Sequence, residues 1–420
     1  SSNNEKFYAT LVQRARTMSD SEDDFPDWSG VIKQNDADSS DSDVASDDAP
    51  IRDAASDSST SDDEAINSSP DKAINPLSLM RERNAMMHSV LSVENGRAFR
   101  AKPTDVFVVT YPKCGTTWCT QICHQIRCVH ARRTNDSIDP MGFGEITEVV
   151  PWDILALDCL QDLYSAQVCT PRVFKSHEAW TDIAKGAKYI CVVRDPVDVF
   201  YSFYNFLPPY MGIEDGAITH AEFADAIFAG ASHSGHVWQH FLGYFDAKYF
   251  DEDVTKTRSD SIMMLCFEDL KENLPECVRR IAAFMGFDDL TDTELDEVVH
   301  ASGFEFMRAN ATKFDDHFVR SKMWKRCGIP ESDWRGGGVG KVRAGGGKIG
   351  GGGAGMSAAV RDRIDAKWTE IMGDRGFDTY SDFRNAVNRL AKMGESLGVS
   401  ASEVDPRWAP KKKKACCVVM

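Results

Sequence analysis

The sequence predicts an α/β fold, in which a sheet of mainly parallel strands carries helices on both faces as three α/β/α layers. From about residue 101 onward, short runs rich in β-branched residues, such as "VFVVT" at 106–110, alternate with segments of helical periodicity. This alternation indicates βαβ units, because two parallel strands need a crossover connection between them. Polar, motif-like residues follow three of the strand segments, and ligands of such sheets bind beyond the carboxyl ends of the strands. We therefore expect a ligand crevice at that edge of the sheet.

The individual elements follow from the same patterns. Strand patterns occupy residues 105–110, 172–175, 188–193 and 261–267. Helical periodicity occupies residues 116–130, 198–206, 220–229, 237–246, 273–285 and 291–301.

Composition divides the chain of 420 residues into four parts. Residues 1–75 are rich in serine and aspartate, and the first 70 hold 17 acidic against 5 basic residues, which accounts for most of the net charge of -17. This part has too little apolar surface to fold, so we expect it to be disordered, either as a solvated acidic tail or as a phosphorylatable switch. A helical lead-in (76–100), the folded domain (101–395) and a basic tail (396–420) follow.

Charge, cysteines and hydropathy exclude several classes of protein. The acidic balance argues against nucleic acid as a partner. Twelve cysteines without a regular framework indicate reduced thiols in a cytoplasmic protein. There is no ligand cluster with metal-site spacing, no signal peptide and no apolar run of about 18 residues that could span a membrane. The sequence begins at Ser1 without a methionine, so a preceding targeting segment stays open.

The first strand runs into "YPKCGTTW" at 111–118, which has the position of a phosphate loop but lacks the glycines of GxxxxGK[ST]. A loop that closes at Gly115 and opens a helix with Thr116 and Thr117 directs unpaired backbone N–H groups at an anion. Lys113 adds a positive charge. Such a short loop suits a single phosphate group better than a β/γ pair, and an ordinary strand-to-helix turn is the alternative.

Two further strand ends carry polar residues of the same kind. "RDP" at 194–196 precedes a helix that contains Ser202, and Arg194 is either an anion-binding residue or the partner of a nearby aspartate. "KSH" at 175–177 places Lys175 and His177 on the same side of a strand end, where His177 is a candidate base.

In this order, the motifs resemble the cytosolic-type sulfotransferases, which use 3′-phosphoadenosine 5′-phosphosulfate (PAPS). The family's opening loop reads YPKSGTTW, and its lysine-threonine-histidine strand end is matched here by KSH. The family also has an arginine followed eight positions later by a serine, as Arg194 and Ser202 are here. "LCFEDLKENL" and "SGFEFM" are similar to two further family segments. The likeness covers residues 101–388.

The resemblance implies a P-loop-like sheet, PAPS as co-substrate, no metal, and in-line transfer of a sulfuryl group to a hydroxyl or amine of a small, apolar acceptor. It implies His177 as the base, with Lys113 at the bridging oxygen and Lys175 at the transferring group. Residues 141–151 and 208–216 are expected to line the acceptor pocket. The implied PAPS-binding residues are Lys113, Cys114, Gly115, Thr116, Thr117, Trp118, Arg194, Ser202, Phe267, Ser302, Arg343 and Gly345.

Departures from the family pattern bear on the expected nucleotide contacts. Cys114 stands where the family has serine, Phe267 where it often has tyrosine, and Ala344 where it has lysine. In the glycine-rich run 335–355, Lys341 competes with Arg343 for the role at the 3′-phosphate. Two other functions stay open at this point. One is a P-loop-type kinase or NTPase, and the other is a membrane-tethered scaffold that binds the nucleotide without turnover.

The sequence ends in "KKKKACCVVM", in which Cys417 begins a C-a-a-X pattern that favours farnesylation and Cys416 offers a palmitoylation site. One lipid chain binds membranes only marginally, and the lysines at 411–414 would supply the second signal on an anionic leaflet. Lys411, Lys412, Lys413 and Lys414 are thus the expected partners of the membrane surface. The pattern predicts a cytoplasmic enzyme tethered to the cytoplasmic face of a membrane. An unmodified tail is the alternative.

Overall fold

The computed structural model describes residues 75–228, 234–250, 260–335, 341, 349–397 and 405–410. The acidic N-terminal segment, Arg343, Gly345 and the tail with Cys416 and Cys417 lie outside the described residues. The predictions for them, and the division of the chain into four parts, stay predictions.

Four parallel strands form the sheet of the described residues. They are β1 (Val106–Thr110), β2 (Val173–Ser176), β3 (Lys188–Val193) and β4 (Ile262–Cys266). Their order is β2-β1-β3-β4, and each neighbouring pair is parallel. Every predicted strand is confirmed to within one residue at either end. After β1 the chain adds β2 on one side and then β3 on the other, so the order reverses at β1. A ligand crevice is expected beyond the carboxyl ends of the strands at such a reversal.

Helices precede the first strand, fill the connections between the strands and follow the last strand. The described α-helices are α2 (Pro76–Ala85), α3 (Val90–Arg97), α4 (Thr116–Arg132), α5 (Ile146–Val149), α6 (Pro196–Tyr204), α7 (Leu207–Tyr210), α8 (His220–Phe228), α9 (Val237–Tyr249), α10 (Phe267–Glu272), α11 (Leu274–Met285), α12 (Asp292–Ala301), α13 (Phe304–Ala309), α14 (His317–Met323), α15 (Glu331–Arg335), α16 (Gly352–Gly355), α17 (Ala358–Met372) and α18 (Tyr380–Leu397). The six predicted helices are confirmed to within three residues. The largest shift at a helix start is in α6, which begins at Pro196 because the Asp195 side chain accepts a hydrogen bond from the Val197 N–H (2.8 Å).

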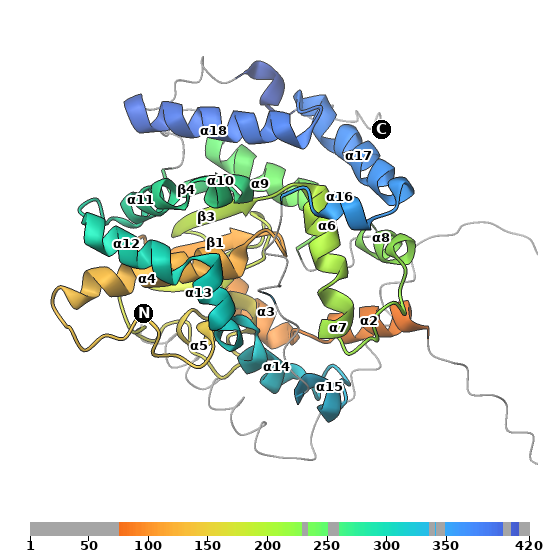
Figure 1. Cartoon of the computed structure of the whole chain (residues 1–420), viewed down its shortest axis with the longest axis horizontal. Coiled ribbons are helices and arrows are strands. Elements are labelled where there is room, and N and C mark those ends of the chain that lie inside the picture. The colour runs from red at the N-terminus through yellow and green to blue at the C-terminus, as the bar shows by residue number, and fades with distance from the viewer. Residues whose placement is uncertain are drawn as a thin grey trace, which may run out of the picture.

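Alternate residues of each strand pack into two separate cores, one on each face of the sheet. On β1, Phe107 and Val109 belong to a core shared with α9, α17 and α18, whereas Val106 and Val108 belong to one shared with α4, α11 and α12. In Figure 1, α17 and α18 (blue) form the top of the molecule, and α4 and α12 lie on the other side of the strands. Because all five residues of β1 are buried, both faces of the central strand are covered, as predicted for a parallel sheet.

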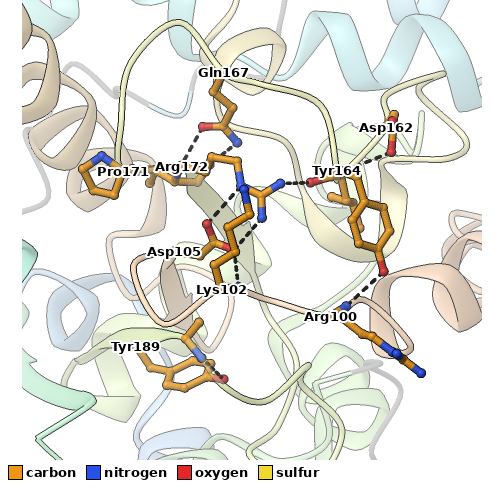
Figure 2. Close-up of polar contacts among 12 residues, drawn as sticks. Arg100, Lys102, Asp105, Asp162, Tyr164, Gln167, Pro171, Arg172 and Tyr189 are labelled. Atoms are coloured by element: carbon orange, nitrogen blue, oxygen red, sulfur yellow. Dashed lines mark hydrogen bonds and ion pairs between the residues drawn. The ribbon is translucent and has the colours of Figure 1, made fainter. Parts of the chain in front are cut away.

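A buried ion pair fixes the starts of β1 and β2 against each other, opposite the edge where the polar motifs lie. The Arg172 guanidinium donates to both carboxylate oxygens of Asp105, at 3.0 and 2.6 Å, and to the Leu163 carbonyl (Figure 2). The Asp105 carboxylate also accepts a hydrogen bond from the Lys102 N–H (2.7 Å). A bidentate pair of this kind is directional, so it helps to define the register that places the ends of β1 and β2 side by side.

The described residues also bear on the cysteines and on membrane insertion. Ten cysteines lie in the described part of the chain, and all ten are buried and free of disulfide bonds. Among the described helices, each is too short or too polar to pass through a bilayer.

Candidate active site

A cavity of about 510 Å³ opens beyond the carboxyl ends of the strands. The predicted site residues that line it come from the ends of all four strands and from the helices that follow them. They are Lys113, Gly115, Thr116, Thr117, Trp118, Lys175, His177, Arg194, Ser202 and Phe267. Residues up to about 150 positions apart in the sequence are therefore brought to one place, as the fold class predicted.

The loop after β1 has the geometry of an anion site. Gly115 is the N-cap of α4 and has a left-handed backbone (φ 101°), and Lys113 is also left-handed (φ 71°). The Cys119 N–H makes the first helical bond, to the Gly115 carbonyl (3.0 Å), so the N–H groups of Thr116, Thr117 and Trp118 precede the helical ladder. These N–H groups and the positive end of the helix dipole favour an anion at this point.

Only glycine fits at position 115. A Cβ atom there would lie 2.9 Å from Cδ2 of Phe267, and the left-handed backbone already disfavours a residue with a side chain. The ring of Phe267 in turn packs edge-on against Trp118, with centroids 5.5 Å apart. The loop and the aromatic wall of the cavity therefore define each other's position.

Cys114 differs from the sequence-based expectation. Cys114 is fully buried, is absent from the cavity wall, and donates its backbone N–H to the Tyr111 carbonyl (3.2 Å), so the contact expected from that N–H is already used within the loop. Burial raises the pKa of its thiol well above the ordinary value. The Thr116 hydroxyl is hydrogen-bonded to the Thr110 hydroxyl. Both residues therefore stabilise the loop itself.

His177 lies at the end of β2 with one ring nitrogen already bonded. Its Nδ1 is 2.8 Å from the Thr110 carbonyl oxygen, and because a carbonyl can only accept, Nδ1 carries the proton. Burial, together with the nearby Lys175 ammonium, lowers the pKa of His177 well below its ordinary value. The imidazole is therefore neutral at physiological pH, and the unprotonated Nε2 is its proton-accepting atom.

The two lysines predicted to be catalytic rest on aromatic rings in the cavity. The Lys113 ammonium lies 3.6 Å from the centroid of Phe206, and the Lys175 ammonium lies 3.8 Å from that of Trp152. Burial lowers the pKa of Lys175 to about 8, and the carboxylate of Asp316 opposes this shift. The aromatic faces stabilise positive charge here without neutralising it.

Arg194 and Ser302, both expected to bind the nucleotide, contact the phosphate loop and the aromatic wall respectively. The Arg194 guanidinium donates to the Lys113 carbonyl (3.0 Å), stacks 4.3 Å from the centre of the Phe267 ring and lies 3.9 Å from the carboxylate of Asp198. The sequence left open whether Arg194 binds an anion or pairs with an aspartate. In the structure, Arg194 both lines the cavity and lies beside Asp198. Ser302 is fully buried and absent from the cavity wall, but its carbonyl accepts from the Trp118 indole N–H (2.8 Å).

The comparison with protein families decides what this site belongs to. Residues 103–333, more than half of the chain, match the family model described as the sulfotransferase domain. The chain belongs to the sulfotransferase family. This membership decides against the kinase and NTPase alternative.

Individual relatives agree with this family. The sulfotransferase is 24 % identical to a flavonol 3-sulfotransferase of Flaveria bidentis over 255 residues, which is 57 % of this chain and 78 % of that protein. It is 30 % identical to an amine sulfotransferase of Oryctolagus cuniculus over 219 residues, 50 % of this chain and 65 % of that protein. Among solved structures, a mouse sulfotransferase complexed with PAP is similar with a TM-score of 0.47 and 18 % identity, over 73 % of this chain and 95 % of that one.

The cavity wall away from the phosphate loop differs from the predicted lining of the acceptor pocket. Of the two segments expected there, 208–216 contributes Tyr210, but 141–151 contributes no residue. Phe143, Ile146 and Val150 instead pack in the core with α4. The wall consists of residues from α2 and the α2–α3 connection, from the segment after Pro151, and from α6, α7 and the link between them. They are Asn84, Met87, His88, Trp152, Ile154, Phe203, Phe206, Leu207 and Tyr210.

Further charged residues line the cavity, and the sequence did not single out Lys271 or Asp316. Lys341, the rival of Arg343, lines it, and so do Asp198 and Asp316. Asp198 accepts hydrogen bonds from the Gly350 and Gly352 N–H groups, at 2.9 and 2.8 Å, so it ties the end of the glycine-rich run to α6. Asp316 precedes a helix, where an aspartate is usually a cap, and this hid its position from sequence analysis. Within the described residues, no three or more histidine, cysteine, aspartate or glutamate side chains gather as a metal site would require.

Proposed function

We propose that this sulfotransferase transfers the sulfuryl group of PAPS to a hydroxyl or amine of a small, largely apolar acceptor, with His177 as the general base. The observation that carries the proposal is the hydrogen bond from His177 Nδ1 to the Thr110 carbonyl. It leaves Nε2 able to accept a proton, at the edge of the sheet where the anion-binding loop begins.

The electrostatics of His177 suit this role. A base must be unprotonated before it acts, and the lowered pKa of His177 keeps the ring neutral at physiological pH. The Thr110 carbonyl fixes the tautomer and also orients the ring. As Nε2 takes the acceptor proton, the imidazolium that forms is stabilised by the same carbonyl.

Lys113 and Lys175 supply the positive charge that the transfer needs. Sulfuryl transfer resembles phosphoryl transfer, in which negative charge spreads over the oxygens and the protein acts chiefly by positioning and electrostatics. Lys113, in the loop after β1, stabilises the bridging oxygen of the leaving nucleotide. Lys175, at the end of β2, stabilises the transferring group. Both are lining residues of the cavity that also holds His177.

The charged residues of the cavity fit a nucleotide with a separate phosphate at each end of its ribose. The N–H groups at the start of α4 suit the 5′ end, and Arg194 and Ser202 suit the 3′-phosphate. Trp118 and Phe267 offer apolar faces to the adenine. Bound PAPS supplies the sulfuryl group. Arg343 and Gly345 keep their proposed place at the 3′-phosphate. Lys341, from the same glycine-rich run, is a described residue and lines the cavity.

The acceptor half supports an apolar, ring-containing molecule. Trp152, Phe203, Phe206 and Tyr210 surround it, and such side chains gain most by burying apolar or aromatic surface. Relatives of similar sequence are named for a flavonol and for an amine as acceptors, so both acceptor chemistries belong to the proposal.

We also propose that the enzyme acts in the cytoplasm and is held at a membrane by lipid on Cys417, with Cys416 as a second acylation site. Support comes from the C-a-a-X pattern and the four preceding lysines. A lipid at Cys417 requires that Met420 is the last residue of the translated chain, and mass spectrometry of the C-terminal peptide tests both points.

The proposed chemistry is tested with ³⁵S-labelled PAPS and a panel of phenols, alcohols and amines. His177→Ala should lower turnover by about 10²-fold or more, the scale of a lost general base, while the Kd for PAP stays within about threefold. His130→Ala, at the far end of α4, is the matched control and should transfer at the wild-type rate.

Two outcomes would contradict the proposal. Near-normal turnover of His177→Ala would remove His177 as the base. Binding of PAP by the wild-type protein without transfer to any acceptor of the panel would favour the non-catalytic scaffold instead.

A further inference from the structure

A buried carboxylate lies between two lysines of the cavity. Asp316 is only 3 % exposed, and its Oδ1 is 3.5 Å from Nζ of Lys175, at the end of β2. Its Oδ2 forms an ion pair with Nζ of Lys341. The carboxylate therefore joins three segments that are distant in the sequence: the end of β2, the start of α14 and residue 341.

A helix-capping role does not explain Asp316. It occupies the N-cap position of α14, yet its side chain makes no capping hydrogen bond. Its neighbour Asp315 provides the local contact instead, accepting from the His317 N–H (3.0 Å). The Asp316 backbone is also left-handed (φ 62°), a conformation that is uncommon for a residue with a side chain. Strain of this kind persists where the surroundings demand it, and it gathers at functional sites.

The charges around Asp316 depend on one another. The lysine ammonium groups hold the pKa of Asp316 well below its ordinary value although the carboxylate is buried. Asp316 in turn raises the pKa of Lys175 against the effect of burial. Glu145, which is also buried, has its pKa raised to about 7 by burial and by the nearby Asp316. Asp316 is thus the carboxylate that stays ionised, and it keeps the ammonium of Lys175 charged.

We propose that Asp316 is a positioning residue for sulfuryl transfer, which holds Lys175 and Lys341 together as charged donors beside His177. The inference rests on the proposed function. Two ammonium groups at one site repel each other, and a long lysine side chain has considerable rotational freedom. A carboxylate bound to both removes the repulsion and fixes the two groups before the acceptor arrives. Fixed donors stabilise developing negative charge without reorganising at the moment of reaction.

The proposal also identifies Lys341 as part of the active site. Its ammonium lies 5.9 Å from the centre of the Phe206 ring, the same ring that carries Lys113 at 3.6 Å. Lys341 therefore lies at the acceptor half of the cavity, where it shares the Asp316 carboxylate with Lys175. Held by Asp316, the Lys341 ammonium is a second positive charge that stabilises the transferring group.

The test compares Asp316→Asn, which keeps the shape and removes the charge, with Asp316→Glu and with the control Asp315→Asn. Asp316→Asn should lower kcat by about tenfold or more, which is less than the roughly 10²–10³-fold loss when a fixed donor is itself removed, because both lysines remain. The affinity of this variant for PAP should not fall, because the carboxylate that is removed repels phosphates. Asp316→Glu should recover part of kcat, and Asp315→Asn should keep the wild-type kcat.

A pH–rate profile separates positioning from a merely structural role. Lys175 must be protonated, and the groups that face it are Asp316, Lys341, Glu145 and His177. Removing Asp316 takes away a negative charge that raises the pKa of Lys175, so the alkaline decline of kcat should move to lower pH. Asp316→Glu should show the decline near the wild-type pH.

Two results would overturn the inference. One is a wild-type kcat in Asp316→Asn. The other is a fall in kcat with an unchanged pH profile and a lowered melting temperature, which would make Asp316 structural. His177→Ala, measured in parallel, keeps the two proposals apart: loss of turnover there with none in Asp316→Asn rejects the Asp316 proposal alone.

Discussion

Replacing Gly115 by alanine perturbs the anion-binding loop at the point where it meets the aromatic wall. The alanine Cβ must adopt a left-handed backbone with φ 101° and would lie 2.9 Å from Cδ2 of Phe267. Phe267 is itself only 7 % exposed and packs against Trp118 and Arg194, so its ring has little room to withdraw. Both the loop and the ring must therefore change.

The size of the effect follows from three contributions. The left-handed conformation costs alanine about 1–2 kcal/mol, and the overlap with a packed ring costs about 1–3 kcal/mol. The reduced freedom of the unfolded chain returns about 0.4–1 kcal/mol. Gly115→Ala should thus lower the free energy of unfolding by about 1–5 kcal/mol, with a centre of about 3 kcal/mol, which corresponds to a melting temperature lower by about 6 °C.

A double-variant cycle with Phe267→Ala separates the two costs. Thermal unfolding of Gly115→Ala, Phe267→Ala and the double variant gives a coupling energy, which should equal the overlap share of about 1–3 kcal/mol. The backbone share should persist in the double variant. Calorimetric titration should show weaker PAP binding in Gly115→Ala, because the first-turn N–H groups of α4 shift. A single variant that melts and binds PAP like the wild-type protein would refute the reasoning.

Two further predictions concern Glu145 and the tail. The pKa of Glu145 is raised to about 7, so its neutral form stabilises the fold at low pH, and this contribution is lost as the pH rises toward and above 7. The melting temperature of Glu145→Gln, compared with that of the wild type, should therefore be more favourable at pH 8 than at pH 5. An equal difference in melting temperature at both pH values would contradict the raised pKa. Cys417→Ser should move the protein from the membrane to the soluble fraction of a cell lysate while the activity on a soluble acceptor is unchanged. A wild-type protein that is already in the soluble fraction would remove the anchor proposal.

Local signals in the sequence were sufficient to predict the fold and the main binding loops. The strand runs, the proline at the start of α6 and the glycine before α4 each act through backbone sterics or hydrogen bonds to near neighbours, and these do not depend on the rest of the chain. Because the ends of parallel strands meet at one edge, the same pattern also predicted that Lys113, Lys175, His177 and Arg194 would share a cavity.

What the sequence could not specify depends on contacts between distant segments. Asp315 and Asp316 look alike as helix-start residues, and only the fold directs one toward its own helix and the other toward Lys175 and Lys341. The sequence likewise could not show that the Cys114 N–H is used inside its own loop or that α2 and its connection contribute to the cavity. The tautomer of His177 was decided by the carbonyl of Thr110 on the neighbouring strand. A side chain's charge and proton depend on its burial and on what faces it, and both are set by tertiary packing.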